Sequence, residues 1–176
     1  MNSLFELLKN RRSIRKYQPK AVEQEKIEII TKAALMSPAS KRSNPWEFIV
    51  VQDKGTLQKL SESRPHGSQF LSDSPLGIVV IADTTKSDVW FEDASIAATI
   101  IQLQAQYLGL GSCWIQIYKR MKNDEISTED YICKLLNIPA HYAILSIISI
   151  GYPAEERKPF DEEKLAYDKI HNEVFQ

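Results

Sequence analysis

A run of basic residues near the start of the chain has the composition of a phosphate-binding segment. Residues 11–15 read Arg, Arg, Ser, Ile, Arg. Guanidinium groups bind phosphate through forked donors, and a serine hydroxyl adds a neutral donor. In an extended loop, alternation places Arg11, Ser13 and Arg15 on one side. A solvated cluster that complements the C-terminus of a preceding helix explains the same residues equally well, so the local sequence leaves both interpretations open.

Two later segments have the composition of ligand-binding loops. Residues 37–48, SPASKRSNPWEF, are rich in small and hydroxyl side chains and lead directly into an apolar run. Small residues let the backbone approach a flat ligand, and the amide of Asn44 both donates and accepts at a ring edge. Residues 151–160, GYPAEERKPF, offer Arg157 and Lys158 as further phosphate contacts. The alternatives are a plain connection with Trp46 in the core, and a solvated charged turn.

Spacing argues against several other kinds of site. GLGSCW at 109–114 resembles a dinucleotide-binding fingerprint, but Trp114 replaces the third glycine and the segment follows an expected helix. No P-loop pattern occurs, and the three histidines lack metal-ligand spacing, so we expect no metal site. Cys113 and Cys133 lie on apolar stretches, where we expect small buried side chains rather than nucleophiles or a disulfide framework.

Length and composition predict a cytoplasmic, globular protein with a single domain over residues 1–176. The chain is 43% hydrophobic and 26% charged, which is enough apolar surface for a packed core. Its 22 Lys and Arg nearly balance its 23 Asp and Glu, which argues against a general nucleic-acid binder. No run of 18 apolar residues occurs, so we expect no membrane partner.

Hydrophobic periodicity predicts five helices and four strands. Ser3 and Glu6 have the spacing of a capping box before a short helix. Further helices are expected at about 23–36, 55–62, 88–108 and 128–137. Strands are expected at 46–52, 78–83, 112–117 and 142–150. The helix at 88–108 is apolar nearly all round in its middle, which indicates a central, buried helix. The last 25 residues are polar and aromatic without a core period.

Because the strands do not alternate regularly with the helices, we expect an α+β fold. It would have a mixed, mainly antiparallel sheet, packed with helices around a central one. Such a small sheet cannot cover the central helix fully, and the aromatic tail has no evident core of its own. Both features are consistent with a dimer whose arms exchange.

Together, the segments resemble the nitroreductase family of FMN-dependent oxidoreductases. RRSIRKY after a short helix, SPAS followed by NPWEF, GLGSCWIQI in the middle and GYPAEERKP near the end occur in the order and spacing of that family. The resemblance runs from about residue 4 to residue 160. Within the family, the chain resembles the compact subgroup described as NADH dehydrogenases or NAD(P)H nitroreductases. Many members have Asn at the position of Arg42, so no role is carried over to that residue.

The resemblance implies a set of FMN contacts, with the cofactor at a homodimer interface. The phosphate and ribityl chain would be held by Arg11, Arg12, Ser13, Arg15, Arg157 and Lys158. The flavin would be contacted from the other subunit by Pro38, Ala39 and Ser40. Asn44 would bond the pyrimidine edge. One ring face would be lined by Trp114, Ile115 and Gln116, with a backbone N–H nearby facing N5. Arg15 would stabilise the anionic reduced ring electrostatically, and no side chain need act as a nucleophile.

The resemblance also implies electron transfer from NAD(P)H, the co-substrate, through flavin N5 to a small, flat acceptor such as a quinone or nitroaromatic, in a ping-pong cycle. Three alternatives stay open: a non-catalytic FMN carrier or sensor, a specialised dehalogenase-like flavin enzyme, and an interaction domain for an acidic protein. The chain lacks the longer insertions of larger members, so their substrate range does not transfer. The sequence leaves the roles of His66 and Trp90 undecided.

Overall fold

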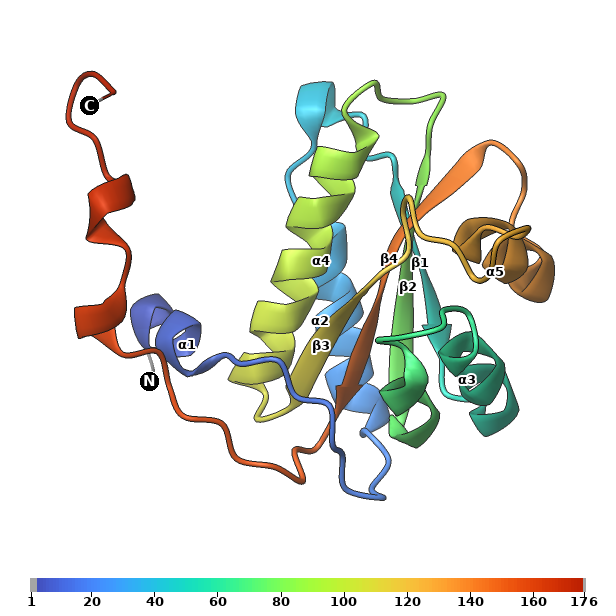
Figure 1. Ribbon diagram of the computed structural model, residues 1–176, viewed down its shortest axis with the longest axis horizontal. Helices are drawn as coiled ribbons and strands as arrows, with labels where there is room; N and C mark the ends of the chain where they lie inside the picture. Colours follow the sequence, from blue (N-terminus) through green and yellow to red (C-terminus); the bar gives the residue numbers. More distant parts are fainter. Residues whose placement is uncertain (1–2, 176) are drawn as a thin grey trace.

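The computed structural model describes residues 3–175, which fold around one four-stranded sheet (Figure 1). Its strands are β1 (Trp46–Val51), β2 (Leu76–Asp83), β3 (Gly111–Gln116) and β4 (Tyr142–Gly151). They lie in the order β1-β2-β4-β3, and every neighbouring pair is antiparallel. A single bridge between Ser13 and Ser112 is parallel. The predicted α+β class with a mainly antiparallel sheet is therefore confirmed.

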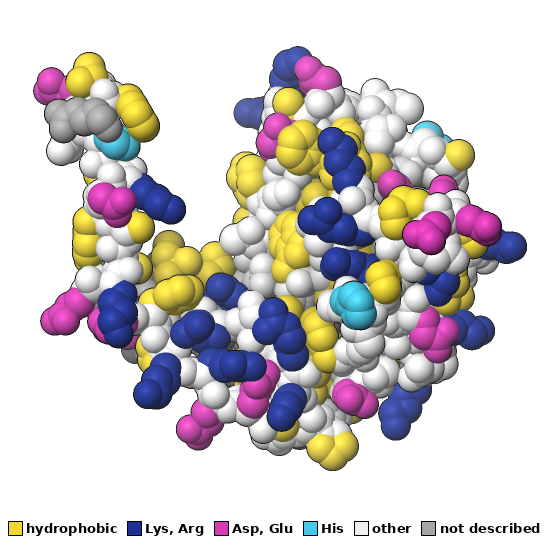
Figure 2. All heavy atoms as spheres, viewed as in Figure 1, with side chains coloured by type: hydrophobic (Ala, Val, Ile, Leu, Met, Phe, Trp, Pro, Cys, Tyr) yellow, Lys and Arg dark blue, Asp and Glu magenta, His cyan; other side chains and the backbone are white. Residues whose placement is uncertain are grey.

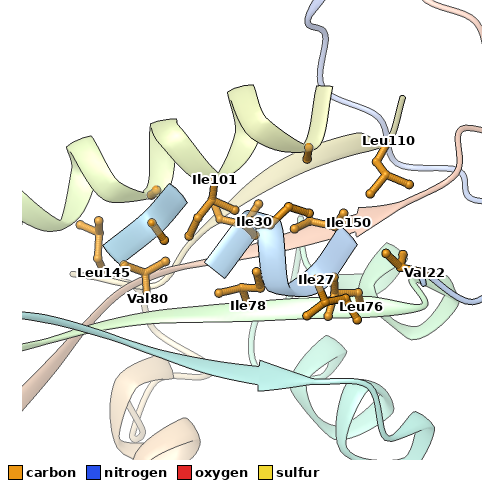
Figure 3. Close-up of a cluster of buried hydrophobic side chains, with 14 of the residues drawn as sticks. Val22, Ile27, Ile30, Leu76, Ile78, Val80, Ile101, Leu110, Leu145 and Ile150 are labelled. Atoms are coloured by element: carbon orange, nitrogen blue, oxygen red, sulfur yellow. The ribbon is translucent and has the colours of Figure 1, made fainter. Parts of the chain in front are cut away.

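Helices cover both faces of the sheet. The long helix α4 (Trp90–Tyr107) and α2 (Gln24–Leu35) lie on one face, and α3 (Lys54–Ser61) and α5 (Thr128–Leu136) lie on the other (Figure 1). On the first face, Ile30 lies near Ile101 and Ile27 lies near Leu76, and all four belong to one buried cluster (Figure 3). Every residue of β2 is buried, as expected for a central strand that is covered twice.

Local chemistry fixes the helix ends. Ser3 accepts a hydrogen bond from the backbone N–H of Glu6 at the start of α1 (Leu4–Asn10). Asp53 and Ser127 cap α3 and α5 in the same way, because a side-chain oxygen satisfies an otherwise unpaired N–H of the first turn. Asn137 ends α5 in the left-handed conformation. The predicted helices and strands are all present, and the bounds that were predicted lie within two residues of the observed ones.

The central helix and both ends of the chain leave apolar surface uncovered. Helix α4 buries only one face: Ile96 is 41% exposed and Tyr107 is 55% exposed. The helix is central, and its face toward the sheet is buried, but the sheet does not cover it fully within the single chain, as the sequence predicts. The tail runs past α1 and away from the body of the fold (Figure 1). Within residues 3–175, no helix is long and apolar enough to cross a bilayer.

Candidate functional site

The basic segment at residues 11–15 is held against the edge of the sheet. Ser13 forms a bridge with Ser112, and the N–H of Ile14 donates to the carbonyl of Ser112 at 3.0 Å. This approach requires glycine at position 111, since a Cβ there would lie 2.8 Å from the Cβ of Ile14. The segment is therefore an extended strand-like arm along β3.

This arm has a buried side and a polar side. Ile14 and Tyr17 are buried, and the Tyr17 hydroxyl lies 2.6 Å from Ser149 Oγ and donates to the carbonyl of Ile14 at 2.7 Å. The opposite side opens on a cavity of about 300 Å³, whose lining is Arg11, Arg12, Ser13, Arg15, Arg157 and Phe160. The structure thus brings together the predicted residues from both ends of the chain.

Glu155 connects the two parts of this cluster, which we call the arginine pocket. Its carboxylate accepts the N–H of Arg15 at 2.7 Å and pairs with the guanidinium of Arg157 at 2.8 Å. The N–H of Arg15, with Arg157 as a lesser cause, lowers the pKa of Glu155. Figure 2 shows Lys and Arg side chains gathered at the lower left, where the early and late segments run together in Figure 1.

The arginine pocket has the donor set that a phosphate requires. Within residues 3–175, no carboxylate lies within ion-pair distance of Arg11 or Arg15. Their guanidinium donors and the Ser13 hydroxyl therefore fit a phosphate of a cofactor such as FMN. Arg12 differs, because it donates to the carbonyl of Lys158 and lies over the ring of Phe160 at 4.8 Å. Lys158 takes part through its backbone carbonyl.

Cys113 lies beside the arginine pocket as a buried thiol. Burial raises the pKa of this thiol, and the nearby Arg15 opposes the effect. Cys113 is 1% exposed and is a free cysteine, as is Cys133. The prediction of a buried small side chain at Cys113 is confirmed, whereas Cys133 is only partly buried.

The outer edge of β3 continues from the arginine pocket. Ile117 donates its N–H to the carbonyl of Leu145 on β4, so the odd-numbered residues of β3 bond inward. The N–H groups of Trp114 and Gln116 consequently point outward, away from β4. The indole N–H of Trp114 donates to Gln116 Oε1 at 2.8 Å. Ile115 is 1% exposed within the core, so its side chain does not line this edge.

The loop at residues 37–44 lies at the opposite end of the same sheet. The loop leads into Trp46, which pairs with Ala82 on β2. Ser112, beside the arginine pocket, pairs with Ile150 on β4, and Ile150 in turn pairs with Leu76 at the other end of β2. Leu76 and Ala82 are six positions apart on β2, which at the strand rise is about 20 Å. Within one chain, the loop that contains Pro38, Ala39, Ser40 and Asn44 therefore does not meet the arginine pocket.

This loop is strained and incompletely bonded. Lys41, Arg42 and Asn44 all have positive φ values, between 42° and 57°, which side chains with a Cβ seldom adopt. The hydroxyls of Ser37 and Ser43 and the indole N–H of Trp46 are buried without a hydrogen-bond partner. The loop is anchored by Asp93, whose carboxylate accepts the N–H of Ser40 at 2.8 Å. Strain and unmet polar groups concentrate at binding sites.

Comparison with known proteins identifies the family. The profile of the nitroreductase family matches residues 8–64 and 57–152 of the chain. The chain belongs to the nitroreductase family. An Archaeoglobus fulgidus protein named "Putative NADH dehydrogenase/NAD(P)H nitroreductase" is 36% identical over 178 residues, covering 98% of this chain and 99% of the relative. The FMN reductase [NAD(P)H] of Bacillus subtilis is 28% identical over 182 residues, covering 90% of this chain and 70% of the reductase.

A solved nitroreductase structure has the same fold. The FMN-dependent nitroreductase of Clostridium difficile R20291 superimposes with a TM-score of 0.95 at 54% identity, covering 96% of this chain and 98% of that chain. The predicted family membership is thus confirmed. The cofactor contacts of individual residues stay predictions, carried by the geometry described above.

Arg64 lies beside the outer edge of β3, and the sequence interpretation missed it. Its guanidinium donates to the carbonyl of Gln116 at 3.0 Å, from the outer side of β3. Burial lowers the pKa of Arg64, and the neighbouring Arg120 adds to the effect. No local pattern could have revealed it, because its partner lies 52 residues along the chain. Trp90 packs edge-on against Tyr118 at 5.0 Å, whereas His66 is exposed in its loop.

Proposed function

We propose that the protein is an FMN-dependent oxidoreductase that takes electrons from NAD(P)H and passes them to flat acceptors such as nitroaromatics or quinones. The observation that carries the proposal is the outer edge of β3. That edge presents outward N–H groups and ends in the arginine pocket, whose Arg11 and Arg15 lack carboxylate partners within residues 3–175. The names of relatives, including an FMN reductase and an FMN-dependent nitroreductase, support it. Use of NAD(P)H agrees with a cytoplasmic location.

The chain's own residues bind and orient the cofactor in this proposal. Arg11, Ser13 and Arg157 hold the phosphate of FMN through charge-assisted hydrogen bonds. The outward N–H of Gln116 would donate to the ring at N5, and Arg15 would stabilise negative charge on the ring electrostatically. The chemistry that FMN supplies when bound is hydride acceptance from NAD(P)H followed by electron donation to an acceptor, in two separate half-reactions.

The other half of the site comes, in this proposal, from a second copy of the chain. The loop at 38–44 stands about 20 Å from the arginine pocket of its own chain, by the strand rise, so it serves the pocket of a partner. An apolar groove of about 300 Å³ between α1 and α4, lined by residues such as Leu4, Leu103 and Tyr107, offers a docking surface. The exposed apolar residues of the tail supply an occupant, among them Tyr167, Ile170 and Phe175. The proposed assembly is a homodimer with exchanged tails.

The visible spectrum of the purified protein tests the proposal directly. We expect a flavin absorption band that bleaches when NADH or NADPH is added without oxygen and returns when a quinone is added. The faster of the two donors gives the preference between NADH and NADPH. A flavin band that persists with both donors would instead identify a carrier. A colourless protein that does not take up added FMN would contradict the assigned site.

A further inference from the structure

A pair of arginines lies at the far end of the β3 edge, beyond the arginine pocket. Arg64 reaches the carbonyl of Gln116, and Arg120 lies in the turn that follows β3, where its N–H donates to the carbonyl of Ile117 at 3.0 Å. Lys122 Nζ donates to the carbonyl of Glu62 at 2.6 Å and so ties the two loops together. The guanidiniums of Arg64 and Arg120 are near enough to interact electrostatically.

This pair has no counter-ion in its own chain. Within residues 3–175, neither Arg64 nor Arg120 has a carboxylate within ion-pair distance. Two like charges held together disfavour each other, and partial burial of Arg64 increases the cost. The hydrogen bond to Gln116 uses one of the five N–H donors of the Arg64 guanidinium. The remaining donors are suited to an oxyanion that the chain itself does not supply.

An aromatic surface adjoins the pair. The ring of Tyr118 stacks on Phe91 with centroids 6.2 Å apart and an interplanar angle of 20°, and Trp90 packs edge-on against the same tyrosine. Phe91 is 42% exposed. Tyr118 also accepts, at its carbonyl, a hydrogen bond from the Gln116 amide at 3.1 Å. A flat apolar surface, an anion-binding pair and the outward N–H of Gln116 therefore lie in one neighbourhood.

We propose that Arg64 and Arg120 form a binding site for an oxyanion group on a flat substrate, whose apolar part lies on the surface of Trp90, Phe91 and Tyr118. The inference rests on the proposed function and deepens it by naming a substrate class. The oxyanion is either the pyrophosphate of the dinucleotide donor or a carboxylate on an aromatic acceptor. Both present paired oxygens to a guanidinium fork, so the shared chemistry is the same.

Calorimetric titration of the FMN-loaded protein distinguishes the two sources. The probes are ADP-ribose for the donor, benzoate for an anionic acceptor and benzamide as its neutral counterpart. Arg120→Gln removes one cation from an exposed turn, and Lys134→Gln makes the same charge change on the exposed side of α5. We expect Arg120→Gln to weaken one anionic probe by about tenfold, in line with the loss of a charge-assisted hydrogen bond, and to leave benzamide unchanged.

Each outcome of this titration decides the proposal. Weakening of ADP-ribose alone assigns the site to the donor, and weakening of benzoate alone assigns it to the acceptor. Partial recovery of affinity in Arg120→Lys would support the role of charge. Equal affinities of Arg120→Gln and Lys134→Gln for both anions overturn the proposal. Because calorimetry needs no turnover, failure of NADH to bleach the flavin would contradict the proposed function separately.

Discussion

The two ends of the sheet differ in how completely a single chain satisfies their buried polar groups. At the arginine pocket, the Tyr17 hydroxyl is bonded and Glu155 joins the arm to the segment after β4. At the other end, the loop at 37–44 has three positive φ values and two unpartnered serine hydroxyls. Unusual backbone conformations cost about 1–3 kcal/mol each and persist only where the surroundings enforce them.

This contrast indicates two kinds of half-site. The arginine pocket is a preorganised anion site that needs only its ligand. The loop at 37–44 is held in an unfavourable conformation by Asp93 and has unmet polar groups, as expected of a surface that is completed from outside the chain. Substitutions at the arginine pocket and in the loop at 37–44 should therefore have different effects.

The largest effect is expected at the arginine pocket. Arg11→Ala or Arg15→Ala should each weaken FMN binding by roughly 1.5–3 kcal/mol, about 10- to 150-fold, because each removes charge-assisted hydrogen bonds. The measurement is the ratio of flavin to protein after gel filtration, followed by titration with FMN. Lys134→Ala on α5 is the matched control and should retain flavin. Full flavin occupancy in both arginine variants would contradict the phosphate assignment.

The approach of the basic arm to β3 should depend on position 111. Gly111→Ala places a Cβ 2.8 Å from that of Ile14, and overpacking of this kind costs about 1–3 kcal/mol. We expect a lower urea midpoint together with weaker FMN binding, because the arm that holds Ser13 must shift. Gly55→Ala is the control: its new Cβ meets only the flexible carboxylate of Asp53, at 3.3 Å. Equal stability of the two variants would show that the arm tolerates the displacement.

The sequence predicts the parts of this architecture that depend on neighbours along the chain. Ser3, Asp53 and Ser127 cap helices within three residues of themselves, and the strands follow from apolar runs. Contacts across long separations cannot be obtained in this way. The bonds of Glu155 to Arg15 and of Arg64 to Gln116 join residues 140 and 52 positions apart. Local composition marks each half of the arginine pocket as a candidate phosphate contact, but only the family resemblance predicts that the two halves lie together.

A smaller effect is expected at the strained loop. Asp93 is 3% exposed, and its carboxylate accepts hydrogen bonds from the N–H of Ser40 and the hydroxyl of Ser87. Asp93→Ala leaves the Ser40 N–H without its acceptor, which costs about 1–3 kcal/mol of folding free energy. The measurement is urea unfolding. Asp93→Asn keeps an oxygen acceptor and should lose less, and identical midpoints for the two variants would show that Asp93 does not anchor the loop.

The smallest effect is a pH dependence at the tether between the two arms of the arginine pocket. The pKa of Glu155 is lowered, chiefly by the N–H of Arg15. Its contribution to stability is therefore fully present above the unfolded pKa of glutamate, about 4.3. It is lost as the pH falls through the lower folded pKa. Glu155→Gln cannot ionise, although its amide oxygen can still accept the N–H of Arg15.

The urea midpoints of the two proteins should consequently differ at pH 7 and converge as the pH falls below about 4, because protonation makes Glu155 resemble glutamine. A difference that stays constant over this range would mean that the charge of Glu155 contributes nothing and that only its shape matters. Convergence would show that ionic contacts within one chain organise the arginine pocket. The loop at 37–44 should show no such dependence in the same variants, since Glu155 bonds the arm on the opposite end of the sheet.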